Sequence, residues 1–215
     1  MPTCYTSAMA RPRPADIRSV LFDLDGVLVD SERAWFETLC LTAERFGAPA
    51  IDWDSFSPTF GQGIVADQRT FFATASIDEV ARAYDELYPG AAAKAELLEG
   101  AVSLLEALRE NGIRTALVTN APRRAAEAVL AEKGLATLLD ATATSTDGPE
   151  KPDPGLVHLA LTQIEGSAAT AVYVGDSVTD RGAANAAGVF FIGRGIDGDV
   201  RVETLVELGR WLDAG

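Results

Sequence analysis

One short stretch limits the possible fold of this chain more than any other. Residues 20–25 read Val-Leu-Phe-Asp-Leu-Asp, so an apolar run typical of a buried strand ends in two aspartates one residue apart. Residues two apart in a strand point to the same side, and open α/β sheets bind ligands at the carboxyl edge of their strands. Two carboxylates this close repel each other unless a cation or a shared proton lies between them, and Mg²⁺ prefers oxygen ligands. The stretch therefore favours a metal site at a sheet edge over a solvated Asp-Gly turn.

Apolar runs and amphipathic segments alternate along the second half of the chain. Strands are expected at 114–118, 171–174 and 189–192, and helices at 97–110, 123–133, 155–164 and through Asn185. Repeated strand, helix, strand order predicts an α/β fold with a Rossmann-like parallel sheet and helices on both faces.

The segment 32–96 differs, because no strand alternation occurs in it. Helices are expected at 32–46, 64–75 and 77–93, with Ser31 able to cap the first helix, Gly47 able to end it and a loop over 48–63. We therefore predict an all-helical insert over 32–96 within a core made of 17–31 and 97–215. Residues 1–16 contain three prolines and no apolar segment, which predicts a disordered extension.

Charge and composition exclude several functional classes. A formal net charge of −14 and a pI near 4.4 argue against a nucleic-acid surface and disfavour anionic membranes. No apolar run has the length of a membrane span. Two cysteines, Cys4 and Cys40, give no indication of a disulfide, which fits a reducing cytoplasm. The oligomeric state is left open.

Four motifs resemble those of one family. Residues 23–32 resemble the first motif, DxDGxLxDSE, of phosphatases in the haloacid dehalogenase-like hydrolase superfamily. Thr119–Asn120, Lys151 and residues 176–180 resemble the other motifs in the same order, so the resemblance covers nearly the whole chain. It points to the phosphoglycolate phosphatase and β-phosphoglucomutase-like branch, and it implies that the helical insert is a cap that closes over the active site.

The resemblance also implies roles for individual residues. Asp23 is expected to be the nucleophile that takes up a phosphoryl group, with Asp25 as its acid/base partner. Thr119 is expected to hydrogen-bond that group, Asn120 to offer donors to the substrate, and Lys151 to balance negative charge.

The expected metal is Mg²⁺. Asp176 is implied as a direct ligand beside Asp23 and the backbone carbonyl of Asp25, and Asp180 as an indirect or water-mediated one. Asp180 has a structural alternative, since acids are also favoured in the first turn of a helix. Arg33, nearest the hinge, is a candidate for binding a second anionic group of the substrate.

The predicted function is Mg²⁺-dependent hydrolysis of a small phosphate monoester through an aspartyl-phosphate. A sugar phosphomutase of the same family is an alternative, disfavoured because the cap loop Thr59–Gly63 lacks the Lys-Gly-x-x-Arg stretch and no histidine follows the hinge. A catalytically silent protein that binds a phosphometabolite is an alternative of another class. Phosphoglycolate, a sugar phosphate and a specialised metabolite phosphate all remain open as the ligand.

Overall fold

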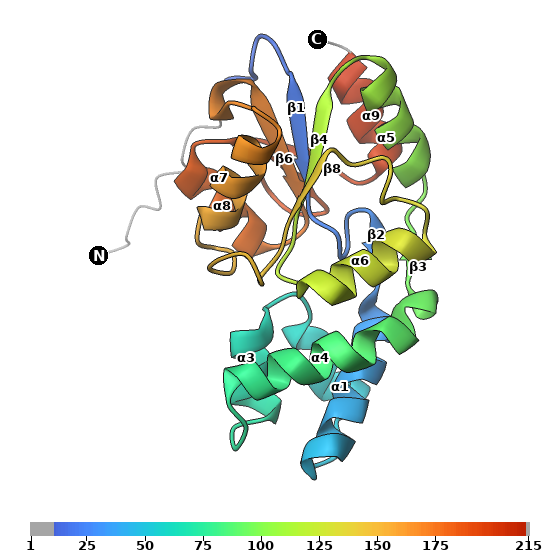
Figure 1. Ribbon diagram of the computed structural model, residues 1–215. Coiled ribbons are helices and arrows are strands. Elements are labelled where there is room, and N and C mark those ends of the chain that lie inside the picture. The colour runs from blue at the N-terminus through green and yellow to red at the C-terminus, as the bar shows by residue number, and fades with distance from the viewer. Residues whose placement is uncertain (1–10, 214–215) are drawn as a thin grey trace, which may run out of the picture.

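The computed structural model describes residues 11–213 and confirms the predicted α/β fold (Figure 1). The main sheet has six parallel strands in the order β5-β4-β1-β6-β7-β8. The strands are β1 (Ser19–Phe22), β4 (Arg114–Val118), β5 (Ala141–Ala143), β6 (Ala171–Gly175), β7 (Phe190–Arg194) and β8 (Val200–Val202). Because β1 pairs with both β4 and β6, the loops after these three strands meet at one edge of the sheet.

Helices cover both faces of the sheet, because successive side chains of a strand point to opposite sides. Val20 and Phe22 pack in one apolar cluster, and Leu21 packs in the other. In Figure 1, α7 and α8 lie on one side of the sheet, and α5 and α9 lie on the other. The core helices are α5 (Ala101–Glu110), α6 (Arg123–Glu132), α7 (Gly155–Gln163), the 3-10 helix η3 (Ala168–Thr170), α8 (Val178–Ala187) and α9 (Leu205–Asp213).

Residues 32–95, which we call the helical insert, lie beyond the carboxyl edge of the sheet (Figure 1). Its elements are α1 (Glu32–Phe46), α2 (Trp53–Phe56), η1 (Ser57–Thr59), α3 (Ile64–Phe71), α4 (Ile77–Ala91) and η2 (Ala92–Lys94). The Trp35 ring packs against Tyr84 and Tyr88, with ring centroids 5.4 and 4.3 Å away. These buried aromatic contacts join α1 to α4 and give the insert an apolar core of its own.

The two chain segments that connect the insert to the core are themselves paired. Strand β2 (Val29–Asp30) runs antiparallel to β3 (Glu96–Leu97), with Val29 opposite Leu97 and Asp30 opposite Glu96. The chain therefore leaves the core and returns to it at the same place.

Several predicted boundaries need correction. The predicted loop 48–63 contains α2 and η1, because the Asp52 side chain accepts a 2.8 Å hydrogen bond from the Ser55 amide and starts a short helix. The helix predicted from residue 97 begins at Ala101, since Glu96–Leu97 is a strand. The short strand β5 at the sheet edge was not among the expected strands.

The structure describes only the last part, 11–16, of the predicted disordered extension over 1–16. Residues 1–10 lie outside the described residues, but residues 11–16 lie against the core. The Arg11 amide donates to Asp199 at 2.8 Å, and the Arg13 guanidinium lies 4.2 Å from the centre of the Trp211 ring. These contacts order the segment, because an arginine can combine an ion or cation–π contact with apolar packing.

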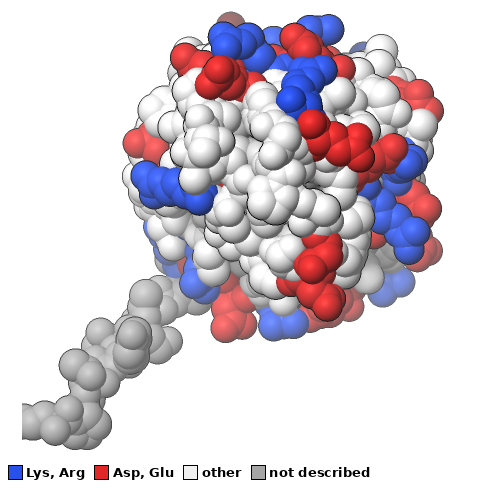
Figure 2. Space-filling model, turned by 90° about the horizontal axis from the view of Figure 1, so that it is seen from below, with Lys and Arg blue, Asp and Glu red and all other residues white. Residues whose placement is uncertain are grey.

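The end of the molecule that carries the insert shows no large basic patch. In Figure 2, blue and red side chains alternate around a mostly uncharged centre. Over residues 11–213, no helix has both the length and the apolar character needed to cross a membrane.

Candidate active site

The predicted site residues come from four loops at the carboxyl edge of the sheet. Asp23 follows β1, and its amide donates to the Val174 carbonyl of β6 at 3.0 Å, which continues the strand pairing by one residue. Thr119 follows β4, Asp176 follows β6, and Lys151 lies in the loop after β5. The parallel order of the strands thus brings together residues up to 153 positions apart in the chain.

Lys151 is the centre of a buried ion-pair network. Its Nζ lies 2.8 Å from Asp23 Oδ1 and 2.7 Å from Asp180 Oδ1, and it donates to the Val118 carbonyl at 3.0 Å. The Tyr173 hydroxyl donates to the same Asp180 oxygen at 2.8 Å. All three ammonium hydrogens therefore have acceptors, which fixes the Lys151 side chain in one position.

These contacts shift the pKa values of the buried groups in opposite directions. Burial lowers the pKa of Lys151, but the carboxylates of Asp180 and Asp23 outweigh burial and raise it above its usual range. Burial alone would raise the pKa of Asp180, yet Lys151 and three hydrogen bonds lower it. The pKa of Asp23 is raised by burial and by the nearby Asp180 charge. One ammonium group thus faces two buried carboxylates, so ionisation of both Asp23 and Asp180 calls for further positive charge.

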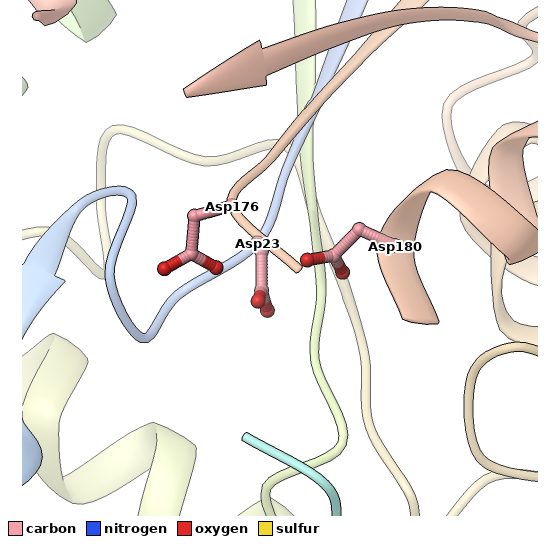
Figure 3. A group of neighbouring side chains, drawn as sticks. All are labelled: Asp23, Asp176 and Asp180. Atoms are coloured by element: carbon pink, nitrogen blue, oxygen red, sulfur yellow. The ribbon is translucent and has the colours of Figure 1, made fainter. Parts of the chain in front are cut away.

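The acid cluster fits a divalent cation. Carboxylate oxygens of Asp23, Asp176 and Asp180 lie within 4.8 Å of one another, and Figure 3 shows the three side chains together. Both oxygens of Asp180 already accept hydrogen bonds, Oδ1 from Lys151 and Tyr173 and Oδ2 from Ser177. Among the described residues, none donates a hydrogen bond to the Asp176 carboxylate. Asp23 and Asp176 are therefore the oxygen donors best placed to hold a hard cation such as Mg²⁺.

The local sequence explains why Asp176 can approach Asp23 so closely. Gly26 has a positive φ of 72°, and a Cβ at this position would lie 1.9 Å from Asp176 Oδ2. Only glycine leaves room for the carboxylate and adopts this backbone conformation without strain. Arg194 on β7 fixes the loop by donating to the Gly26 carbonyl at 2.7 Å.

Asp25 is held apart from this cluster. Its Oδ1 accepts hydrogen bonds from the Ser31 hydroxyl and, at 3.1 Å, from the indole N–H of Trp35. Ser31 precedes α1 but its side chain forms no cap hydrogen bond, so the predicted capping role is wrong, because the hydroxyl is used by Asp25. Burial raises the pKa of Asp25, and the two donors oppose that shift. Its role as proton donor and acceptor, and its backbone carbonyl as a ligand, stay predictions.

Thr119 and Asn120 occupy neighbouring positions with different partners. The buried Thr119 hydroxyl accepts the Ala121 amide at 3.0 Å and keeps its own hydrogen for another acceptor. Asn120 binds the backbone of Lys151 on both sides, accepting its amide at 2.7 Å and donating to its carbonyl at 3.1 Å. The Asn120 side chain therefore positions Lys151, and because Asn120 also lines the cavity, the substrate contact predicted for it stays a prediction.

A cavity of about 160 Å³ lies between these loops and the helical insert. Asp23, Asp25, Thr119, Lys151 and Asp176 line its core side. The insert side is formed mainly by apolar and aromatic side chains, with Asp67 among them. Asp180 lies behind Lys151 and is fully buried. Arg33 is exposed on α1 and does not line the cavity, so the structure does not bring this predicted substrate contact to the site.

Four residues of the site carry roles that the sequence patterns did not indicate. Tyr173 reads as an ordinary residue of an apolar strand, yet its hydroxyl holds Asp180. The Tyr84 hydroxyl donates a 2.9 Å hydrogen bond to Asp67, and both residues belong to the insert and line the cavity. Glu150, next to Lys151 in the chain, accepts the Ile64 amide at 3.2 Å at the start of α3. The Glu-Lys dipeptide thus contacts both the insert and the acid cluster.

Comparisons with known proteins agree with this geometry. The family model of haloacid dehalogenase-like hydrolases matches residues 17–188. A phosphoglycolate phosphatase of Cupriavidus necator is 33% identical over 179 residues, which cover 80% of this chain and 78% of that protein. A validoxylamine A 7'-phosphate phosphatase of Streptomyces hygroscopicus subsp. limoneus is also 33% identical over 179 residues, covering 80% of this chain and 83% of that protein.

A solved structure shares the fold as well. CbbY from Rhodobacter sphaeroides, crystallised in complex with phosphate, superimposes with a TM-score of 0.78 at 24% identity and covers 90% of this chain and 96% of its own. The match of the family model to most of the chain, together with two phosphatases at 33% identity, decides the classification. The chain belongs to the haloacid dehalogenase-like hydrolases, in the branch that includes the phosphoglycolate phosphatases, and is a phosphatase.

Proposed function

We propose that this phosphatase hydrolyses a small-molecule phosphate monoester through an aspartyl-phosphate on Asp23, with Mg²⁺ as cofactor. The observation that carries the proposal is the set of Asp23, Asp176 and Lys151 at one cavity wall, with Asp25 held separately on the same wall. Such a reaction needs a nucleophile, a cation site, a fixed ammonium group and a separate acid. Phosphoglycolate and sugar phosphates are candidate substrates by analogy with named relatives.

Each proposed step uses a side chain on the cavity wall. A carboxylate oxygen of Asp23 attacks the phosphorus, and the bond from phosphorus to the leaving oxygen breaks while Asp25 donates its proton to that oxygen. Asp25 then accepts a proton from a water molecule as the water oxygen attacks the phosphorus and the bond from phosphorus to the Asp23 oxygen breaks. Inorganic phosphate leaves, and Asp23 and Asp25 return to their starting states. The raised pKa of Asp25 supports its carrying a proton at the start.

The remaining residues reduce the repulsion between an anionic nucleophile and an anionic substrate. Asp23 and Asp176 would hold Mg²⁺, which when bound supplies positive charge next to the phosphoryl oxygens. Lys151 contributes a second, fixed positive charge, and the Thr119 hydroxyl has a hydrogen to donate to a phosphoryl oxygen. Asp180 is proposed to position Lys151, in line with the four hydrogen bonds its oxygens accept.

We further propose that the helical insert is a cap over the site, with residues 17–31 and 97–215 as the core domain. Support comes from the cavity, whose wall is shared between insert and core, and from Glu150, whose carboxylate accepts the Ile64 amide of the insert. A cap of this kind would exclude water from the reaction and contact the leaving group.

Phosphate release from a panel of small phosphate esters tests the proposal. Wild-type protein with Mg²⁺ should release phosphate from at least one ester, and release should stop with EDTA and resume when Mg²⁺ is restored. Asp23→Asn should lower release by at least about 10³-fold while keeping the folded circular dichroism spectrum. Formation of an isomerised sugar phosphate without free phosphate would favour the mutase alternative. Binding of esters without any turnover would favour a catalytically silent protein that binds a phosphometabolite. Full activity in Asp23→Asn would refute the nucleophile.

A further inference from the structure

The two walls of the cavity differ in charge. Lys151 is the sole lysine or arginine among the described residues that line the cavity, and it belongs to the core wall. The insert wall consists of the aromatic and aliphatic side chains of Trp35, Phe56, Phe60, Ile64 and Tyr84 and neighbouring groups, with one carboxyl group, Asp67. A leaving group that enters the insert side therefore meets mainly apolar surface, with Asp67 as its one carboxyl group and smaller polar groups from Thr59, Tyr84 and the backbone of Gly61 and Gly63.

Asp67 is placed to interact with a ligand. It lies on α3, and the Tyr84 hydroxyl donates to its Oδ2 at 2.9 Å. Among the described residues, none donates a hydrogen bond to its Oδ1. Asp67 is half-buried, and burial, opposed by the Tyr84 hydrogen bond, raises the pKa of its carboxyl to about 7. A donor from the ligand would provide the missing partner.

We propose that Asp67 selects the leaving group of the substrate, and that this leaving group carries a hydroxyl or amine donor and no carboxylate or second phosphate. The inference rests on the proposed phosphatase reaction and deepens it, because among the candidate substrates it favours a hydroxyl-bearing phosphate over phosphoglycolate, whose leaving group carries a carboxylate. Above pH 7, where Asp67 is mostly ionised, a carboxylate on this side would lie beside a like charge, with no described cation on the insert wall to offset the repulsion. A donor would instead satisfy the free oxygen of Asp67, and the rest of the leaving group would pack against the aromatic side chains.

Homologous alkyl phosphates test this selection directly. Three series carry a terminal amine, hydroxyl or carboxylate on chains of two to five carbons, so that length and charge vary independently. At pH 8 and at the chain length that reaches Asp67, kcat/KM for the amine or hydroxyl ester should exceed that for the carboxylate ester by at least about tenfold. Hydrolysis of p-nitrophenyl phosphate by the same protein reports the phosphatase reaction separately.

Variants assign the selection to one side chain. Asp67→Asn should reduce the amine-to-carboxylate ratio to within about threefold, and Asp67→Lys should reverse it. Asp54→Asn removes the same charge from an exposed position of the insert outside the cavity and should keep the wild-type ratio.

The outcomes separate the two proposals. If p-nitrophenyl phosphate is hydrolysed but the carboxylate series is preferred at every length, or the ratio is the same in Asp67→Asn and wild type, the selection by Asp67 is refuted and the phosphatase reaction stands. If no ester is hydrolysed, the proposed function itself fails. Reversal by Asp67→Lys together with an unchanged Asp54→Asn would establish the selection.

Discussion

The core wall and the insert wall of the cavity are built in opposite ways. On the core wall, charged groups hold one another through short ion pairs and hydrogen bonds, as Lys151, Asp23 and Asp180 do. On the insert wall, ring packing dominates, and Asp67 has Tyr84 as its described hydrogen-bond partner. A preorganised charged wall suits a step common to all phosphate esters, whereas an apolar wall with few polar groups suits discrimination between leaving groups.

The difference leads to a simple expectation for substitutions. A change on the core wall should affect every ester by a similar factor, because it acts on the phosphoryl group. A change on the insert wall should alter the ranking of esters, because it acts on the leaving group.

Lys151→Met should have the largest effect of any single substitution on the core wall besides that of the nucleophile. Removal of the ammonium leaves Asp23 and Asp180 buried without their shared cation, and such losses typically cost about 3–5 kcal/mol of stability. We expect kcat to fall by about 10²- to 10³-fold for all esters and the melting temperature to drop. Steady-state kinetics and calorimetry measure the two effects. Lys94→Met, which removes a lysine from an exposed position, is the control. If the fall in kcat in Lys151→Met differed from ester to ester, the division between the two walls would be contradicted.

Trp35 lies on the insert wall, but its indole N–H acts on Asp25 of the core wall, so Trp35→Phe should have a smaller effect of the same kind. The variant keeps an aromatic ring against Tyr84 and Tyr88 but loses the 3.1 Å hydrogen bond to Asp25. Because this donor stabilises the carboxylate, its loss should raise the pKa of Asp25 further, move the alkaline limb of the pH–rate profile, where Asp25 loses its proton, upward and lower kcat by about tenfold. A pH–rate profile superimposable on that of wild type would show that the indole acts only through packing.

Asp67→Asn should change stability in a pH-dependent manner. The folded-state pKa of Asp67 is about 7 against a usual value of 3.8, so the folded protein binds this proton more tightly than the unfolded chain. Wild type therefore loses stability relative to Asp67→Asn as the pH rises from about 4 to 7, and the variant should be more stable by about 1–4 kcal/mol at pH 8. Melting temperatures at pH 4, 6 and 8 measure this gap. A gap that does not grow with pH would show that Asp67 titrates normally.

Glu150→Gln should have the smallest effect. The neutral glutamine side chain still offers an oxygen to the backbone N–H of Ile64. It loses, however, the negative charge that is favourable at the N-terminus of α3. KM should rise by about two- to threefold, with kcat nearly unchanged, if contact with the insert assists substrate binding. Glu99→Gln, exposed and away from the cavity, controls for the loss of one charge. A large fall in kcat would instead assign Glu150 to the chemistry of its neighbour Lys151.

The core wall could be anticipated from sequence to a large extent, for a physical reason. Asp23, Thr119 and Asp176 each follow a buried strand directly, and parallel pairing brings all such positions to one edge. Asp180 lies in the first turn of α8, where the helix N-terminus favours an acid, as the sequence indicated. Local signals and sheet topology suffice for these residues.

The insert wall could not be anticipated in the same way. Asp67 and Tyr84 lie on different helices, and neither the spacing of apolar residues nor a motif indicates that they meet. Trp35 reads as a packing residue, and only the turn of the chain after Gly26 brings its indole N–H to Asp25. Tyr173 is likewise hidden in an apolar strand. Such contacts depend on how helices pack, which periodicity alone does not determine.

The paired strands β2 and β3 have a consequence for engineering. Because Asp30 and Glu96 lie opposite each other, the ends of the insert are adjacent, and a foreign segment with adjacent ends can replace it without displacing the sheet. Exchange of residues 32–95 with the corresponding segment of a relative should transfer leaving-group preference as a single cassette. Recombination between related genes at these two positions would likewise produce new phosphatases from an unchanged catalytic half.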